Sequence, residues 1–169
     1  MPDAVRLADD DRAPDHDHGR CVDDALGRAA ALCARRGARL TELRRRVLEL
    51  VWQGHEAVKA YDVLKRLGGA PGSAKPPTVY RALDFLMAHG LVHRLESLNA
   101  YVGCPQPEHA HRGRFLICDA CGHVAEFDSA ALRAAIADQA DDQGFAVRDE
   151  TVEVRGLCQR CRASAPGQS

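Results

Sequence analysis

Two short cysteine pairs are the most chemically specific feature of this sequence. Cys118-Asp-Ala-Cys121 and Cys158-Gln-Arg-Cys161 both have the form C-x2-C. Each pair brings two thiolates to one tight turn, and two such turns complete the tetrahedral four-thiolate shell of a structural Zn2+ site. Residues 122–157, which number 36, separate the pairs, and this exceeds zinc-finger spacing. We therefore expect a zinc-stapled domain; a redox dithiol is the alternative, but it leaves a second pair unexplained.

A second group of potential ligands is scattered along the chain. His93 and Cys104 bound a β-like segment, whereas His111 and Glu126 follow a proline-containing hinge, and His109 can replace His111. If one ion binds four of them, it bridges two domains and sets their relative orientation. One thiolate among nitrogen and oxygen donors favours Zn2+ over Fe2+ or Mn2+. The residues alone leave open that these are ordinary polar side chains.

Next to these ligands lies a segment that predicts a DNA-reading helix. Its apolar side chains recur at i, i+3, i+4, i+7 and i+8: Val79, Ala82, Leu83, Leu86 and Met87. Pro77 suits a first helical turn and Gly90 suits a helix end. Thr78, Tyr80 and Arg81 stay outside the apolar face, at the helix N-terminus that a recognition helix presents to a major groove. An ordinary surface helix is the alternative.

The elements around this helix predict a winged helix-turn-helix domain. Periodicity indicates helices over residues 23–36, 42–53 (capped by Thr41) and 58–67, the last with Tyr61 exposed and able to meet a phosphate. Residues 68–77 form a turn-rich connector. Two β-like runs, 91–96 and 100–103, then form a hairpin. Cys21 and Cys33 are expected to be inert or packing residues, and Trp52 to belong to the core.

The C-terminal part predicts a small α/β domain of β-β-α-β order. Strands are expected over 114–118, 123–127 and 145–154, with a break in the last near Asp149. The helix before the last strand has Ser129 as its cap and Gly144 as its stop, with an inner face of Leu132, Ala135, Ile136 and Ala140. So small an apolar set needs a metal, a partner chain or both for stability.

These observations give an α+β chain with defined boundaries. We expect a disordered acidic tail over 1–20, a winged-helix domain over 21–104, a hinge over 105–112, a zinc-stapled domain over 113–163 and a disordered tail over 164–169. Although the net charge is −1, residues 21–92 carry twelve Lys and Arg against seven Asp and Glu, hence +5. That is a modest footprint for phosphate contact. We see no signal peptide and no membrane span, so we expect a cytoplasmic protein without a membrane partner.

The combined motifs resemble the ferric uptake regulator family, and most closely its zinc uptake branch. The resemblance rests on TELRRRVLELV, AYDVLKRL, PPTVYRALDFL, GLVHRLESLNAYVGC, H-x-H and ICDACG, in that order, and covers about residues 33–161. It implies a homodimeric, zinc-dependent repressor that binds palindromic, A·T-rich operators of zinc-uptake genes, with the C-terminal domain mediating dimerisation. Members that sense iron, manganese or peroxide usually lack a thiolate at Cys104, so that residue carries the choice of branch; such a regulator is the alternative.

The resemblance also implies roles for individual residues and two zinc ions per subunit. The structural ligands would be Cys118, Cys121, Cys158 and Cys161, and the regulatory ligands His93, Cys104, His111 and Glu126. Tyr61 would contact the DNA backbone, while Tyr80 and Arg81 would lie in the groove and Arg81 would read a purine.

An enzyme is the hypothesis from another class that the zinc ligands raise. Zinc deaminases pair H-x-E with P-C-x-x-C, but no proline precedes Cys118. The His55-Glu56 pair is not followed by a histidine at metalloprotease spacing. We therefore expect no enzymatic activity. A zinc-stapled interaction module without DNA binding would leave the winged-helix pattern unused.

Overall fold

The chain forms two compact units, one within residues 14–110 and one within residues 111–169. The computed structural model describes residues 18–54, 56–68, 75–108 and 113–164, so His109, His111 and most of both predicted tails lie outside the described residues. Within the described part, no helix combines the length and apolar character needed to cross a bilayer.

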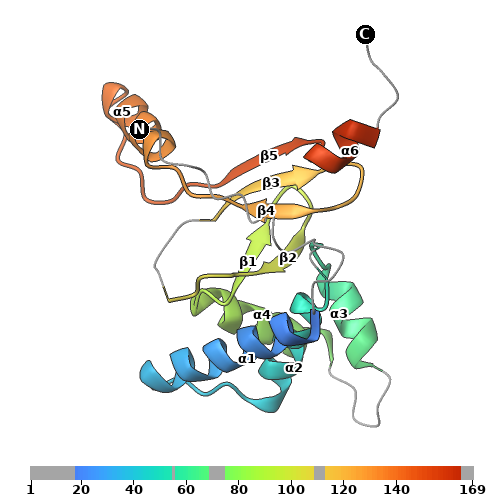
Figure 1. Ribbon diagram of the computed structural model, residues 1–169. Coiled ribbons are helices and arrows are strands. Elements are labelled where there is room, and N and C mark those ends of the chain that lie inside the picture. The colour runs from blue at the N-terminus through green and yellow to red at the C-terminus, as the bar shows by residue number, and fades with distance from the viewer. Residues whose placement is uncertain (1–17, 55, 69–74, 109–112, 165–169) are drawn as a thin grey trace. The chain divides into compact units, whose positions relative to one another are not determined.

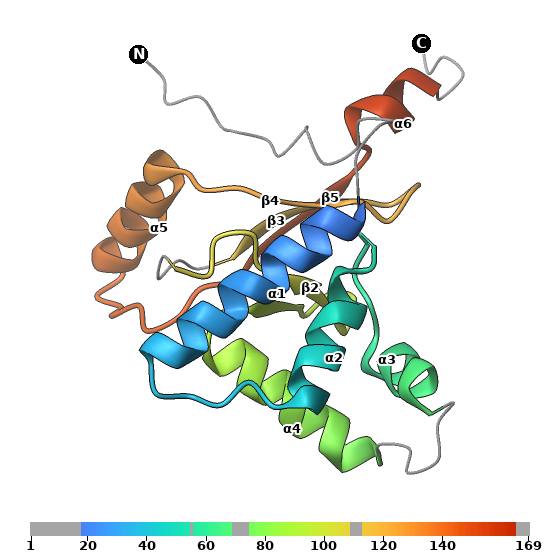
Figure 2. The same ribbon diagram turned by 60° about the horizontal axis from the view of Figure 1, so that its bottom comes forward.

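Four helices and a hairpin make up the first unit. They are α1 (His18–Arg35), α2 (Glu42–Trp52), α3 (Ala60–Leu67), α4 (Pro76–Ala88), β1 (Val92–Leu95) and β2 (Ala100–Gly103). Figure 2 shows α2 and α3 lying against α4. Side chains from all four helices and the hairpin form one core, which includes Leu26, Leu48, Val63, Leu83 and Val92. The predicted helix-turn-helix order is therefore present, although α1 begins at His18, five residues before its expected start at Asp23.

Local sequence signals account for where these helices begin and end. The Thr41 hydroxyl accepts a hydrogen bond from the amide of Arg44 and caps α2. Two prolines open α4, where the missing amide hydrogens have no helical partner. Gly90 ends that helix with φ +69°, a left-handed conformation that favours glycine, and the next amide, of Leu91, returns to Leu86 O. The expected caps and stop are confirmed.

The hairpin forms the predicted wing. Its antiparallel register pairs His93 with Val102 and Leu95 with Ala100, and its turn contains Asn99 at φ +46°. Tyr101 exchanges two backbone hydrogen bonds of 2.8 Å with Val58, so the segment before α3 adds a third extended piece to the wing. The wing is therefore tied to the helices by backbone bonds as well as by its apolar side chains.

A three-stranded sheet with two helices makes up the second unit (Figure 1). Its elements are β3 (Arg114–Cys118), β4 (Val124–Glu126), α5 (Ala130–Asp142), β5 (Val152–Gly156) and α6 (Gln159–Ser164). The strand order is β4-β3-β5, with β4 antiparallel and β5 parallel to β3. This is the predicted β-β-α-β order. However, β5 starts at residue 152 instead of 145, and α6 was not predicted.

Helix α5 departs from its predicted packing. Ser129 accepts a 3.2 Å hydrogen bond from the Leu132 amide and Gly144 has φ +66°, as the sequence indicates. None of the side chains of α5 is buried, though: Leu132, Ile136 and Ala140 are half-buried and Ala135 is exposed. The expected inner face of this helix is therefore wrong for the chain by itself.

Candidate metal centre and nucleic-acid interface

The four cysteines of the two C-x2-C pairs come together at one end of the second unit's sheet. Cys118 ends β3 and Cys121 lies in the turn to β4, whereas Cys158 follows β5 and Cys161 lies in α6. Their sulfur atoms all lie within 4.8 Å of one another. The Cys121 and Cys158 sulfurs are 3.8 Å apart, which is about the edge of a tetrahedron with Zn–S bonds of about 2.3 Å. The donor set and its spacing therefore fit zinc.

Backbone amides make one of these thiols acidic. The Cys158 amide donates to the Cys118 sulfur over 3.3 Å. Hydrogen bonds from the backbone of Cys158, then of Cys121, lower the pKa of Cys118 to about 6, because they stabilise the thiolate. Hydrogen bonds with the other cysteine side chains, first that of Cys158, raise the pKa of Cys161 to about 12. Within the cluster, Cys118 therefore favours the ionised form that a metal ligand requires, whereas Cys161 favours the protonated form.

The first unit contributes two further potential ligands at the base of the wing. His93 lies in β1 and Cys104 directly follows β2, and their donor atoms lie within 4.8 Å of each other. The Cys104 amide donates to Leu91 O over 3.0 Å, and the Cys104 side chain is buried. Hairpin pairing therefore brings an imidazole and a thiol together although ten residues separate them. Glu126 is the last residue of β4 in the second unit.

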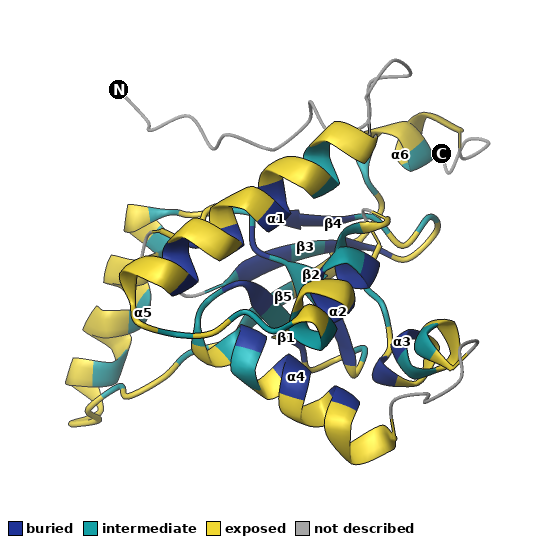
Figure 3. Cartoon of the chain, turned by 90° about the horizontal axis from the view of Figure 1, so that it is seen from below, coloured by how far each residue is buried: buried dark blue, intermediate teal, exposed yellow. Residues whose placement is uncertain are grey.

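Helix α4 presents a polar side to solvent, as its periodicity predicts. Val79, Ala82, Leu83 and Leu86 are buried, whereas Thr78, Tyr80, Arg81 and Asp84 are exposed, and Figure 3 shows the alternation of buried and exposed positions along the helix. Tyr80 is 51% exposed and Tyr61, on the first turn of α3, is 69% exposed. Both rings are therefore accessible to a partner.

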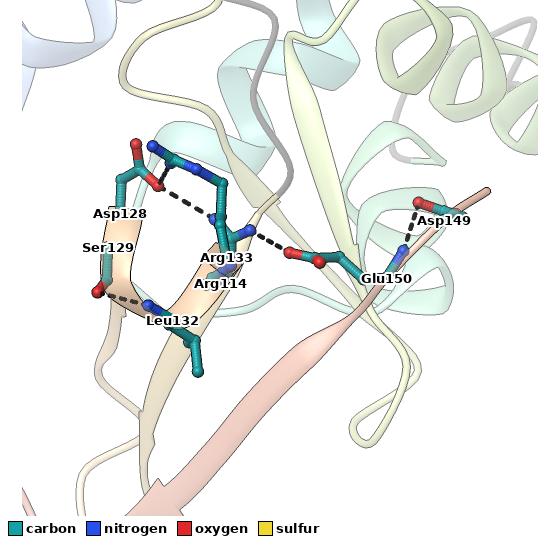
Figure 4. Close-up of polar contacts among 7 residues, drawn as sticks. All are labelled: Arg114, Asp128, Ser129, Leu132, Arg133, Asp149 and Glu150. Atoms are coloured by element: carbon teal, nitrogen blue, oxygen red, sulfur yellow. Dashed lines mark hydrogen bonds and ion pairs between the residues drawn. The ribbon is translucent and has the colours of Figure 1, made fainter. Parts of the chain in front are cut away.

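Sequence reasoning missed two arginines that organise the regions around these groups. Arg114, the first residue of β3, is 1% exposed and forms ion pairs with Asp128 and Glu150 (Figure 4). Arg28 of α1 donates a 2.9 Å hydrogen bond to Pro105 O, just after Cys104. An arginine that opens an apolar strand is a weak signal, and its partners could not be found from spacing alone.

The first unit has a wing that follows an exposed helix N-terminus, and the chain also carries a four-thiolate cluster. Together these features define a class of zinc-binding, DNA-binding regulators. The chain belongs to the ferric uptake regulator family, whose model matches residues 35–155.

Individual relatives point to one branch of the family. The chain is 43% identical over 141 residues to the zinc uptake regulation protein of Escherichia coli, covering 82% of this chain and 81% of that protein. Among solved structures, a zinc uptake regulator complexed with zinc and DNA matches with a TM-score of 0.79 and 41% identity, over 85% of this chain and 96% of that chain. Holo XcZur matches with a TM-score of 0.76 and 42% identity, over 83% and 98% of the two chains.

Proposed function

We propose that this protein is a zinc-responsive transcriptional repressor whose zinc-loaded homodimer binds palindromic, A·T-rich operators and represses zinc-uptake genes. The observation that carries the proposal is the wing. One hairpin brings His93 and Cys104 within 4.8 Å of each other, and the helix directly before it exposes Tyr80 and Arg81. Potential metal ligands and DNA-facing residues thus belong to consecutive elements. The similarity to zinc uptake regulators supports zinc as the signal.

The structural zinc site of this proposal consists of Cys118, Cys121, Cys158 and Cys161. Its support is the fourfold sulfur donor set and the 3.8 Å sulfur separation. The first pair begins at the last residue of β3 and the second pair follows β5, and these two parallel strands have their own backbone pairing. Bound zinc would supply folding energy to a unit that has few buried large side chains.

The regulatory site consists of His93, Cys104, His111 and Glu126, with His109 as a substitute for His111, which gives two zinc ions per subunit. His93 and Cys104 hold the donors in the first unit, and β4 holds Glu126 in the second. Residues 105–112 then act as the hinge, so ligands on both sides of it restrict the orientation of the DNA-binding unit. A shift in occupancy from about 1:99 to about 99:1 needs about 5.5 kcal/mol of preference for the bound orientation.

The second unit mediates dimerisation in this proposal. Strand β5 lies at an edge of its sheet, and Val154 and Leu157 are 49% and 46% exposed. They line a hollow of about 450 Å³ together with Leu116 and Ala125. An edge strand beside exposed apolar side chains tends to associate with another chain. A second copy of the same edge can pair with its backbone groups and bury its apolar side chains.

DNA contact belongs to the first unit. Arg81 and Tyr80 would enter the major groove from the N-terminal half of α4, with Thr78 beside them, while Tyr61 on α3 contacts a phosphate. Pairing two subunits places the two α4 helices on half-sites about 34 Å apart or a multiple of it. This requirement is why operator palindromy accompanies the homodimer.

Operator binding against buffered free zinc tests the proposal. Fluorescence anisotropy on an A·T-rich palindromic duplex should show tight binding only when zinc exceeds the concentration that keeps the four-cysteine site loaded. Iron and manganese at matched free concentrations, and a peroxide-treated sample, serve as controls. A response to iron, manganese or peroxide in place of zinc would favour a regulator for that signal. Binding without any metal dependence would refute the regulatory site.

A further inference from the structure

The sheet of the second unit has a cysteine cluster at one end and an arginine–carboxylate network at the other. At one end, Cys118 is the last residue of β3, Cys121 lies in the turn after it, and Cys158 and Cys161 follow β5. At the other end, Arg114 opens β3 and lies in register with Val152, the first residue of β5. Its guanidinium contacts Asp128, which follows β4, over 3.1 Å, and Glu150, which precedes β5. Figure 4 shows the arginine between these two carboxylates, which come from opposite sides of β3.

Glu126 lies at the arginine end of this sheet. It is the last residue of β4, a three-residue edge strand, and pairs with Phe115. Beyond that pair, the backbone of Arg114 accepts a 2.9 Å hydrogen bond from the Phe127 amide, while its side chain binds Asp128. Arg114 thus holds the two residues that directly follow Glu126, one through its carbonyl and one through its guanidinium.

Burial makes the contact of Arg114 with Glu150 a defined one, whereas the Asp128 side chain is 59% exposed. Arg114 is 1% exposed, and the Glu150 side chain is 12% exposed, so water competes little for either charge. The planar guanidinium can bind both carboxylates at once through separate nitrogens, as Nη1 and Nη2 do here. Arg133 of α5 also binds Asp128, but from a side chain that is 49% exposed.

We propose that Arg114 is a positioning residue for regulatory zinc: it fixes the end of β4 so that the Glu126 carboxylate is held ready to act as a ligand. This inference rests on the proposed regulatory site. It assigns a role to a residue that would not itself touch the metal. Residues behind the ligands that orient them commonly change metal affinity by about 10- to 100-fold when removed.

The test measures zinc affinity of the full-length dimer by competition with a chromogenic chelator, after the four-cysteine site has been loaded. Arg114→Met should weaken the second zinc-binding event by about 10- to 100-fold while four-cysteine occupancy and circular dichroism stay as in the wild type. Arg114→Lys should fall between, because an ammonium cannot serve both carboxylates in the same way. Arg133→Met is the matched control and should stay within about twofold of the wild type, as expected of a surface change.

Two further variants make each outcome decisive. If Arg114→Met does not fold, Glu150→Gln retains the shape of the network while removing one charge, and should weaken the same binding event. Glu126→Gln reports on the site itself: no effect of this change would refute the proposed ligand. If Glu126→Gln weakens the second zinc-binding event but Arg114→Met and Glu150→Gln both keep wild-type affinity, the positioning role alone is overturned. Equal loss at both zinc sites would mean general unfolding and would also overturn it.

Discussion

Individual side chains in this protein have roles that their surroundings decide. Arg81 lies in the N-terminal half of α4 and Arg114 opens β3, yet Arg81 is exposed and Arg114 is buried between two carboxylates. Cys104 and Cys118 are both buried thiols, yet one lies beside an imidazole and the other beside three sulfurs. Substituting the same residue type at these positions should therefore produce different effects.

Arg81→Ala should weaken operator binding by about 1–3 kcal/mol and relax base preference at one position of each half-site. The reason is that Arg81 is exposed on the N-terminal half of α4, where its loss would remove the proposed base contact without disturbing the core. Anisotropy titrations with operators mutated one base pair at a time measure both effects. Unchanged discrimination at every position would show that Arg81 does not read a base.

Cys104→Ser should give a folded protein that no longer responds to zinc, whereas Cys118→Ser should unfold the second unit. Four-thiolate zinc sites supply on the order of 10 kcal/mol of folding energy, which exceeds what so small a sheet can lose. Circular dichroism with and without a chelator separates the two variants. An equal loss of structure in both would count against two distinct sites.

At the scale of elements, the wing depends on close packing at its last residue. Gly103 ends β2, and a Cβ atom at this position would lie 2.3 Å from two atoms of the Trp52 indole ring. Trp52 closes α2 and is half-buried, so the ring and the strand form one surface. Only a residue without a side chain permits this contact next to Cys104.

Gly103→Ala should destabilise the first unit by about 1–3 kcal/mol, because overpacking forces the Trp52 ring or the strand to move. The displaced strand should also weaken zinc-dependent operator binding, since Cys104 is the next residue. Thermal unfolding followed by circular dichroism measures the loss of stability, because the control variant lacks Trp52, the only tryptophan in the chain. The double variant with Trp52→Leu provides the control, because the smaller side chain should recover part of the loss.

Sequence patterns anticipated most elements but fewer of the contacts between them. Periodicity predicts helices α2 to α4, the wing and β3. Capping and stop residues such as Thr41 and Gly90 predict the helix ends, because their effects act within one turn. The partners of Arg114 lie 14 and 36 residues away, and no local signal marks them. The predicted inner face of α5 is wrong for a single chain, because its apolar side chains are at most half-buried and find too few partners there. His93 and Cys104 could be anticipated because a hairpin joins them; the remaining regulatory ligands stay predictions.

The whole molecule has an unequal division of apolar surface between its units. The first unit has a continuous core from α1 to the wing, whereas the second leaves Phe145, Val154 and Leu157 exposed. This asymmetry matches the proposed roles, because a dimer interface would bury the apolar side chains that the second unit exposes.

Val154→Asp should convert the proposed homodimer to a monomer, because the exposed edge strand would bring two like charges together at a symmetric interface. Sedimentation velocity measures the state, and operator affinity should fall with it because each monomer occupies one half-site. Ala34→Asp, an exposed change on α1 in the other unit, is the control and should remain dimeric. A Val154→Asp protein that still sediments as a dimer would contradict the assignment of β5 to the interface.

The parallel pairing of β3 with β5 also determines the order in which the two units can fold during synthesis. Chains emerge from the ribosome N-terminus first and their domains fold as units. All four helices and the wing that form the first core end by residue 103, so that unit can fold while the rest is still being made. The sheet of the second unit lacks its edge strand, and two of its four sulfurs, until residues 152–161 have been added. The surface that would join two subunits is therefore completed only after the first unit has been synthesised, and dimerisation through it must wait for residues 152–161.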